Sequence, residues 1–168
     1  NKDEDVFCER VYSPAVDMEN IMREKSIPLF ALESREPITN FDFVTFTLQY
    51  ELSYTNILNI LDLANIPILK EERTLEDPFI MVGGPCAYNS EPLADFVDVV
   101  ILGEGEEVNL EVVNEYKEWK KNKTTREDFL YKISSIEGVY IPSFYDVKYN
   151  EDGTVQSVTP NREGITKN

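Results

Sequence analysis

The chain has 168 residues, a length typical of one domain and sufficient to bury a sizeable core. Its 42% hydrophobic and 11% aromatic residues indicate a globular protein rather than a disordered one. With 32 acidic and 16 basic residues the net charge is −16, which disfavours direct binding to nucleic acid or to an anionic membrane surface.

Residue types narrow the chemistry further. The chain has no histidine, so the commonest metal ligand and the commonest general base near neutral pH are both missing. Its two cysteines, Cys8 and Cys86, form no CxxC pair and are expected to be free thiols. No apolar run reaches the roughly 20 residues that span a bilayer, and no signal-peptide pattern opens the chain, so we expect a cytoplasmic protein without a membrane partner. Since the first residue is Asn1 rather than Met, we expect a fragment of a longer protein.

The N-terminal quarter of the chain predicts a short strand and a helix. Residues 5–14 alternate apolar and polar side chains as a strand does. Residues 16–27 have helical spacing, with Asp17 as a candidate N-cap. Residues 28–34 are either a strand or an extended connection. The apolar side chains expected on the buried face of the helix are Val16, Ile21, Met22 and Ile27.

The middle of the chain alternates strand and helix patterns. Residues 41–49 are β-branched and aromatic, which is typical of a buried strand. Residues 53–66 repeat apolar side chains at helical spacing until Pro67 ends the pattern. Residues 69–78 are expected to form a solvated loop that leads into a strand over 79–84.

The remaining elements follow in the same way. Residues 90–96 predict a short helix, and residues 97–103 are a continuous apolar run typical of a strand buried on both faces. Residues 106–123 form a clear amphipathic pattern, and residues 124–136 predict one more helix. Residues 138–160 predict a hairpin that leads away from the sheet, with its turn at Asp152 and Gly153.

Strands that alternate with helices predict a mainly parallel sheet built from βαβ units. The pattern changes after Asn122. We therefore predict an α/β domain over residues 1–122, with flanking helices, followed by a helix and an antiparallel hairpin over residues 123–168.

In an open parallel sheet, ligands bind outside the carboxyl ends of the strands. Glycine there permits a positive φ or the close approach of a ligand. The residues alone leave two alternatives for Gly83 and Gly84, a tight turn or a ligand cradle, and neither GxGxxG nor GxxxxGK occurs. The candidate binding residues at the three strand ends are Thr47, Leu48, Gln49, Tyr50, Gly83, Gly84, Pro85, Gly103, Glu104 and Gly105.

The GEGEE segment places Glu104, Glu106 and Glu107 at the start of a predicted helix. Carboxylates in this position stabilise a helix, because they interact favourably with the positive end of its dipole. We prefer this role and capping to metal binding. The same carboxylates would repel a phosphate group.

Residues 82–108, VGGPCAYNSEPLADFVDVVILGEGEEV, resemble a family signature. The signature is GGP, then a Pro-Glu or Glu-Pro pair, then Asp-hydrophobic-GEGE, and it belongs to the cobalamin-binding-type domains that precede the radical SAM barrel. Residues 10–37, 46–67 and 76–96 are similar to one subfamily of these proteins, described as Fe-S oxidoreductases. The resemblance covers nearly the whole chain up to the hairpin.

The resemblance implies a Rossmann-like or flavodoxin-like sheet that carries a corrinoid at the carboxyl ends of its strands. The contacts would come from the ten candidate residues named above, with no catalytic residue and no metal ligand in this chain. A histidine ligand to cobalt is excluded, and Cys86 is interpreted as a small buried residue rather than a ligand. The domain is then either corrinoid-binding or degenerate, with no cofactor.

The resemblance also implies parts of the protein outside this chain. The family has an upstream strand-helix unit whose strand lies in the middle of the sheet. Without it the sheet would have unpaired edges or a gap, so we expect residues 1–168 alone to form a homodimer or to be held by another segment. Downstream, the family has a CxxxCxxC motif that holds a [4Fe-4S] cluster for cleavage of S-adenosylmethionine. Two cysteines cannot supply that motif, so the chain is expected to be non-catalytic and to work with the radical SAM barrel of the same polypeptide.

Three functions follow, in order of preference. The first is an accessory domain of a radical SAM iron-sulfur enzyme. The second is an interaction scaffold without a cofactor. The third is a flavin-binding or nucleotide-binding domain of flavodoxin type, placed last because the chain has no phosphate loop and no histidine.

Overall fold

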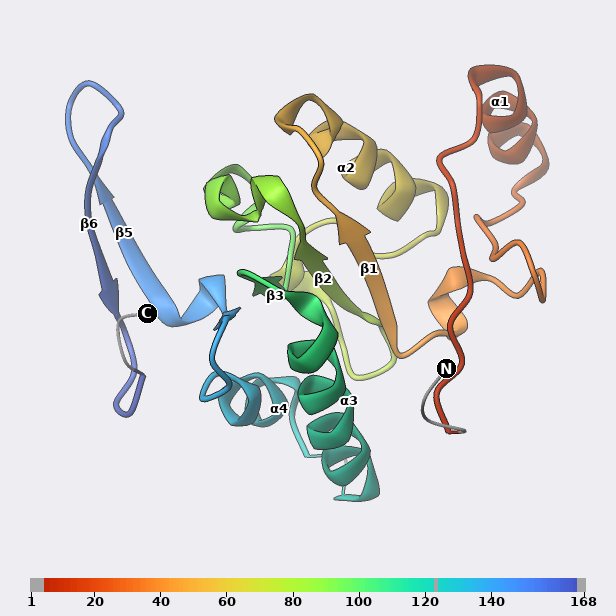
Figure 1. The fold of residues 1–168 in the computed structure, drawn as a ribbon. Coiled ribbons are helices and arrows are strands. Elements are labelled where there is room, and N and C mark those ends of the chain that lie inside the picture. The colour runs from red at the N-terminus through yellow and green to blue at the C-terminus, as the bar shows by residue number, and fades with distance from the viewer. Residues whose placement is uncertain (1–4, 123, 166–168) are drawn as a thin grey trace.

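The computed structural model describes residues 5–122 and 124–165. Figure 1 shows a central sheet with helices on both faces and a separate hairpin beside it. The sheet has four strands in the order β1-β2-β3-β4; the first three are parallel and the last is antiparallel to its neighbour. The mainly parallel α/β sheet with flanking helices is therefore confirmed. The strands are β1 (Phe43–Thr47), β2 (Phe79–Gly83), β3 (Val99–Ile101) and β4 (Val139–Tyr140).

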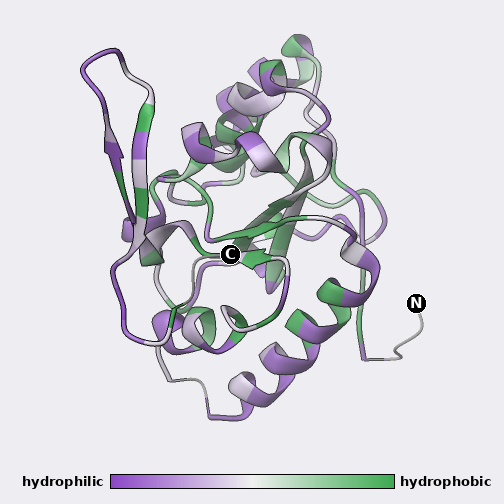
Figure 2. Ribbon diagram, turned by 60° about the vertical axis from the view of Figure 1, so that its left-hand side comes forward, coloured by the Kyte–Doolittle hydropathy of each residue, from purple (hydrophilic) through white to green (hydrophobic). Residues whose placement is uncertain are grey.

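The sheet separates two apolar cores because side chains alternate between its faces. One face packs against α2 (Tyr54–Leu63) through residues such as Ile80 and Val100. The other face packs against α3 (Gly105–Asn122) and α4 (Arg126–Ile133). Figure 2 shows hydrophobic strands between helices whose outer surfaces are hydrophilic. Burial on both faces explains why β2 and β3 are continuous apolar runs in the sequence.

Helix α1 (Val16–Lys25) lies at the periphery and is less buried than its sequence predicts. Met22 is buried, whereas Val16 and Ile21 are exposed. The helix instead meets α2 through a polar contact, in which the Arg23 guanidinium donates to the Asp62 carboxylate over 2.5 Å. The expected N-cap was also wrong, since the N-cap position is Ala15 and no side chain caps the helix.

Two segments for which the sequence suggested a strand contain no regular strand in the structure. Residues 5–14 are extended but form no strand, because Arg10 pairs with the loop at Leu32 and Glu33 and not with the sheet. Residues 28–34 are an extended connection whose single bridge joins Phe30 to Pro37.

The expected helix over residues 90–96 is replaced by short 3-10 turns. The turn within this range is Glu91–Leu93, and its main-chain hydrogen bonds join residues three apart, such as the Ala94 N–H to the Glu91 oxygen over 3.0 Å, instead of four apart as in an α-helix. The 3-10 turns of the described chain are η1 (Ile38–Asn40), η2 (Glu51–Ser53), η3 (Lys70–Glu72), η4 (Pro85–Asn89), η5 (Glu91–Leu93) and η6 (Pro142–Phe144).

The C-terminal region differs from its prediction at one end. The hairpin, β5 (Tyr145–Tyr149) and β6 (Val155–Pro160), is confirmed and turns at Gly153 with φ +84°. Its predicted start was wrong, because β4 joins the main sheet beside β3. Position 123, the predicted end of one helix, lies outside the described residues.

Two further observations concern the sheet and the helices. Neighbouring strands pair directly, so the described sheet has no internal gap, but the outer edge of β1 has no strand partner among the described residues.

Within residues 5–122 and 124–165, no helix is long and apolar enough to cross a membrane.

Candidate functional site

The turn after β2 is a structural corner. Gly84 has φ +99°, and a Cβ there would lie 3.2 Å from both the main-chain nitrogen and the oxygen of Leu48. The Cys86 N–H donates to that same Leu48 oxygen over 3.0 Å, which holds the turns after β1 and β2 together. Gly84 is therefore required by the contact between two loops.

The turn after β3 is open. Gly103 has φ +91°, but nothing lies within 4 Å of a Cβ built on it. A Cβ at Gly83 would make only ordinary contact, 3.5 Å from the Cβ of Ile101. The glycines at the strand ends thus serve different purposes, and space for a ligand exists beside Gly103 rather than at Gly84.

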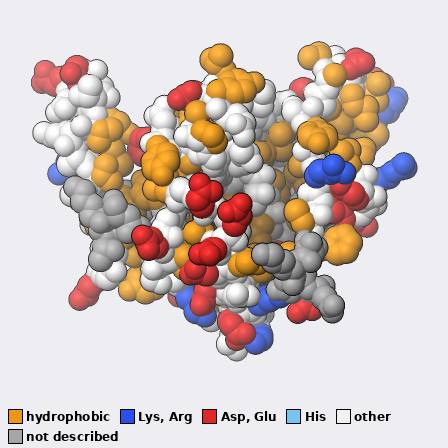
Figure 3. All heavy atoms as spheres, in the orientation of Figure 1, with side chains coloured by type: hydrophobic (Ala, Val, Ile, Leu, Met, Phe, Trp, Pro, Cys, Tyr) orange, Lys and Arg blue, Asp and Glu red, His pale blue; other side chains and the backbone are white. Residues whose placement is uncertain are grey.

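A groove runs from this end of the sheet along β1 and has a volume of about 1440 Å³. It lies between the extended segment 5–12, β1 and α3, and we call it the β1 groove. Figure 3 shows acidic side chains gathered over α3, with hydrophobic side chains in the hollow beside it. The candidate residues that line the groove are Thr47, Gly83, Gly84, Gly103, Glu104 and Gly105.

The other four candidate residues are not among the residues that line the groove. Leu48 is fully buried in the core beneath the turns, and Tyr50 is exposed. Gln49 and Pro85 belong to the same turns, and neither lines the groove. The structure thus brings six of the ten predicted residues to one groove and separates four of them from it.

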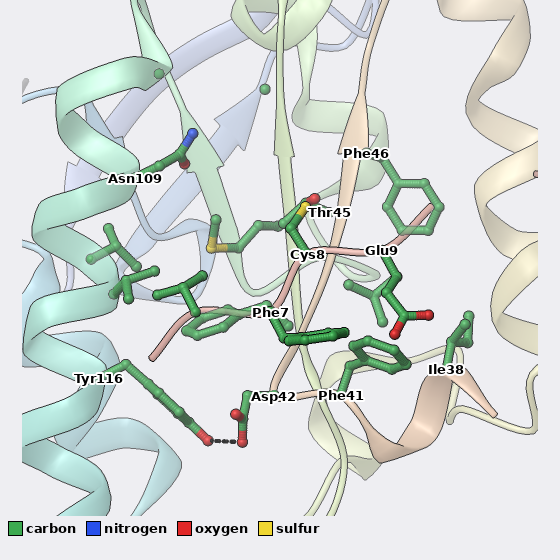
Figure 4. Close-up of a pocket in the computed structure, with 18 of the residues that line it drawn as sticks. Phe7, Cys8, Glu9, Ile38, Phe41, Asp42, Thr45, Phe46, Asn109 and Tyr116 are labelled. Carbon is green, nitrogen blue, oxygen red and sulfur yellow. Dashed lines mark hydrogen bonds between the residues drawn. The ribbon is translucent and has the colours of Figure 1, made fainter. Parts of the chain in front are cut away.

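The amino end of the groove carries a polar cluster that the sequence did not reveal. The Tyr116 hydroxyl donates to the Asp42 carboxylate over 2.6 Å (Figure 4). The Lys120 ammonium lies 2.6 Å from the same carboxylate oxygen. The pKa of Tyr116 is raised well above its usual value, mainly by burial and in addition by the hydrogen bond to Asp42. Tyr116 therefore stays protonated and acts as a donor. No local signal could have found this contact, because 74 residues separate the two partners.

Two acidic residues of the GEGEE segment lie in the first turn of α3. These residues are Glu106 and Glu107. A carboxylate in this position interacts favourably with the positive end of the helix dipole. Among the described residues, no group of three or more potential ligands could hold a metal ion.

Cys86 is held in a protein contact. Its Sγ lies 3.3 Å from the Gln49 oxygen, and burial together with the nearby Glu51 carboxylate raises the pKa of the thiol. The thiol is therefore less ionised than an ordinary cysteine, which lowers its nucleophilicity. Tyr54 donates to the main-chain oxygens of Cys86 and Asn89 and so fixes the shape of η4.

One buried ionic cluster was missed. We expected residues 69–78 to form a solvated loop. Arg73 in this segment is instead buried, and its guanidinium donates to the Asp98 carboxylate over 3.0 Å. The available signal was Asp98, an acidic residue within the apolar run 97–103, since a buried carboxylate needs a partner.

A family model described as radical SAM proteins, N-terminal, matches residues 1–142. An uncharacterized protein of Methanocaldococcus jannaschii is 36% identical over 143 residues, which cover 73% of this chain and 30% of the relative. The chain therefore spans less than a third of that relative's length. No solved structure matches this chain.

Proposed function

Because the chain belongs to the family of N-terminal domains of radical SAM proteins, we propose that it is a non-catalytic accessory domain of a radical SAM iron-sulfur enzyme. In this proposal a separate barrel of the same polypeptide binds the [4Fe-4S] cluster and S-adenosylmethionine. The present domain packs against that barrel.

An exposed apolar surface at the carboxyl ends of β1 and β2 carries this proposal. Tyr50 is 56% exposed, Leu52 87% and Tyr88 75%. The loops that hold them are linked, because the Asn89 amide donates to the Glu51 carboxylate over 3.3 Å. Large apolar side chains gathered at one surface are typical of an interface. We call Tyr50, Leu52 and Tyr88 the carboxyl-end surface.

The test is a pair of aspartate substitutions, Leu52→Asp with Tyr88→Asp, in the full-length protein. We expect S-adenosylmethionine cleavage, measured as 5′-deoxyadenosine formation, to fall, because a loss of about 1.4 kcal/mol of interface energy would weaken docking on the barrel about tenfold. Leu110→Asp is the control, because Leu110 is also exposed but lies on α3. Equal rates for the three proteins would argue against the interface.

A second candidate, a corrinoid, is supported by the six candidate residues at the carboxyl end of the β1 groove. The open turn at Gly103 fits a bulky ligand, and the residues that would hold it are Thr47, Gly83, Gly103 and Gly105. A bound corrinoid would supply cobalt-based radical chemistry. Glu104 lies at this end as well and would oppose a phosphate in the nucleotide tail.

Addition of cobalamin tests this candidate through the absorption spectrum of the bound corrinoid. Gly83→Val should abolish binding by filling the groove, whereas Gln156→Val on the exposed hairpin should not. A spectrum unchanged by the protein would favour an interaction scaffold without a cofactor.

A further inference from the structure

The hairpin formed by β5 and β6 has one apolar face and one polar face. Residues directly opposite each other in an antiparallel pair point to the same face. The apolar face consists of three side chains from each strand that pair in this way: Tyr145, Val147, Tyr149, Val155, Val158 and Pro160. The other face carries polar pairs such as Lys148 with Ser157. This division is typical of an antiparallel sheet that packs one face against another layer.

The described chain covers the apolar face only in part. At the base of the hairpin, the Tyr145 ring packs against the Tyr140 ring, with 5.0 Å between the ring centroids. Further along, Tyr149 is 52% exposed, and Val155 opposite it is 50% exposed. Figure 3 shows hydrophobic side chains on the side of the hairpin that faces the rest of the domain, with a hollow between the two. The apolar face therefore borders an open hollow.

Two contacts fix where the hairpin stands. At its base, the Asn161 N–H donates to the Phe144 oxygen over 3.0 Å. Nearer its turn, the Tyr149 hydroxyl donates to the Glu91 carboxylate of η5 over 2.8 Å, although these partners are 58 positions apart. A two-stranded hairpin is marginally stable unless its apolar face packs against further structure. The fixed position and the apolar face together indicate a docking surface.

We propose that the apolar face of the hairpin docks on the catalytic part of the same polypeptide, and we call this face the hairpin surface. The inference rests on the proposed accessory function and adds a second contact between the domain and the barrel. The family model ends at residue 142, so the hairpin lies outside the matched N-terminal domain and leads toward the catalytic part. The matched region covers only 30% of the relative, so a protein of this kind has ample further chain to dock there.

The location of the hairpin surface also favours the barrel as its partner. Tyr149 is bonded to Glu91, which lies three positions after Tyr88 of the carboxyl-end surface. The two surfaces therefore adjoin, and one partner can contact both. A partner tethered by the same chain binds at a high effective concentration, so a modest apolar area is sufficient. A second copy is disfavoured, because each copy carries a net charge of −16 and the two would repel.

Hydroxyl-radical footprinting of the full-length protein, read by mass spectrometry, tests the proposal. Tyr149, which is 52% exposed, is compared with Tyr131 of α4, which is 48% exposed and belongs to neither proposed surface. Because both side chains are tyrosines of nearly equal exposure in this chain, a difference in their modification rates reports additional cover by the rest of the protein. We expect Tyr149 to be modified several-fold more slowly than Tyr131.

Val155→Asp and Ser157→Asp form the matched pair of variants, because they place a carboxylate on opposite faces of β6. Val155 is already half exposed, so its replacement costs the hairpin itself little. In the full-length protein, Val155→Asp should raise the modification rate of Tyr149 to about that of Tyr131, because burying an unpaired carboxylate is unfavourable. Ser157→Asp should leave the rate unchanged. Circular dichroism establishes that both variants are folded, and if Val155→Asp does not fold, the comparison of the two tyrosines in the unaltered protein decides the outcome alone.

The same footprint separates this inference from the proposed function. Tyr88 is 75% exposed in this chain and reports on the carboxyl-end surface. Protection of Tyr88 without protection of Tyr149 would retain the proposed docking and overturn the hairpin surface. Protection of Tyr149 alone would support the hairpin surface and count against the carboxyl-end surface.

Three further results would overturn the proposal. The first is an equal modification rate for Tyr149 and Tyr131 in the unaltered full-length protein. The second is an equal rate for Tyr149 in the two folded variants. The third is protection of Tyr149 that disappears when the protein is diluted, since a second copy would then be the occupant.

Discussion

Asp98 is the buried carboxylate on which the amino ends of β2 and β3 depend. Its Oδ2 accepts from the main-chain N–H of Ile80 over 2.7 Å, from Arg73 over 3.0 Å and from Arg126 over 3.2 Å. The Arg73 side chain is 0% exposed and that of Asp98 5% exposed, so both charges are removed from water. Asp98→Asn would leave the Arg73 charge buried and uncompensated.

The loss of unfolding free energy in Asp98→Asn depends on the hydrogen bonds that Arg73 would keep. Arg73 would still donate to the main-chain oxygens of Pro67, Ile68 and Phe96. Burial lowers the pKa of Arg73, and the Asp98 carboxylate opposes that shift, so this carboxylate compensates the buried charge. Removing one partner of a buried ion pair costs about 3–5 kcal/mol. Because asparagine keeps an acceptor oxygen, we expect a loss of about 3 kcal/mol, at the lower end of that range.

Urea unfolding followed by the fluorescence of Trp119 measures this loss, because this single tryptophan lies on α3 and is buried in the core with residues of α4. Asp62→Asn is the control. It removes the pair with Arg23, whose side chains are 43% and 49% exposed, and should cost less than about 1 kcal/mol. A loss for Asp98→Asn no larger than that of the control would refute the reasoning.

Two further predictions use the turn glycines and a helix cap. Gly84→Ala should destabilise the chain by about 3 kcal/mol, because it adds both left-handed strain and a clash with Leu48, whereas Gly103→Ala adds about 1 kcal/mol of strain alone; equal shifts in thermal unfolding would contradict this. Hydrogen bonds from Thr125 lower the pKa of Asp128 below its usual 3.8 in the capping box of α4. A pKa that is lower in the folded state contributes stability above the unfolded value and loses it as the pH falls through the folded one. The stability difference between the unaltered chain and Asp128→Asn should therefore shrink below about pH 4, and a difference independent of pH would be evidence against the cap.

Much of the fold could be predicted from local pattern. The apolar run at β2 and the periodicity of α3 each report the environment of a single element, and both elements formed where expected. Local pattern misled at α1, where apolar spacing predicted a buried face but α2 covers only Met22. It also misled over residues 90–96, where a helix was expected and the chain forms the 3-10 turn η5.

The sequence by itself determined the three parallel strands β1 to β3, the helices α2, α3 and α4, the two-sided burial of β2 and β3, and the glycine turns at the carboxyl ends of those two strands. The tertiary structure alone decided what those turns do: Gly84 is a corner because Leu48 lies against it, whereas the Gly103 turn is open. It also decided that β4 joins the sheet, that Arg73 is buried and that the edge of β1 faces a groove. These outcomes depend on contacts between residues far apart in the chain, such as Arg73 and Asp98, which are 25 positions apart. Local periodicity carries no information on such pairs.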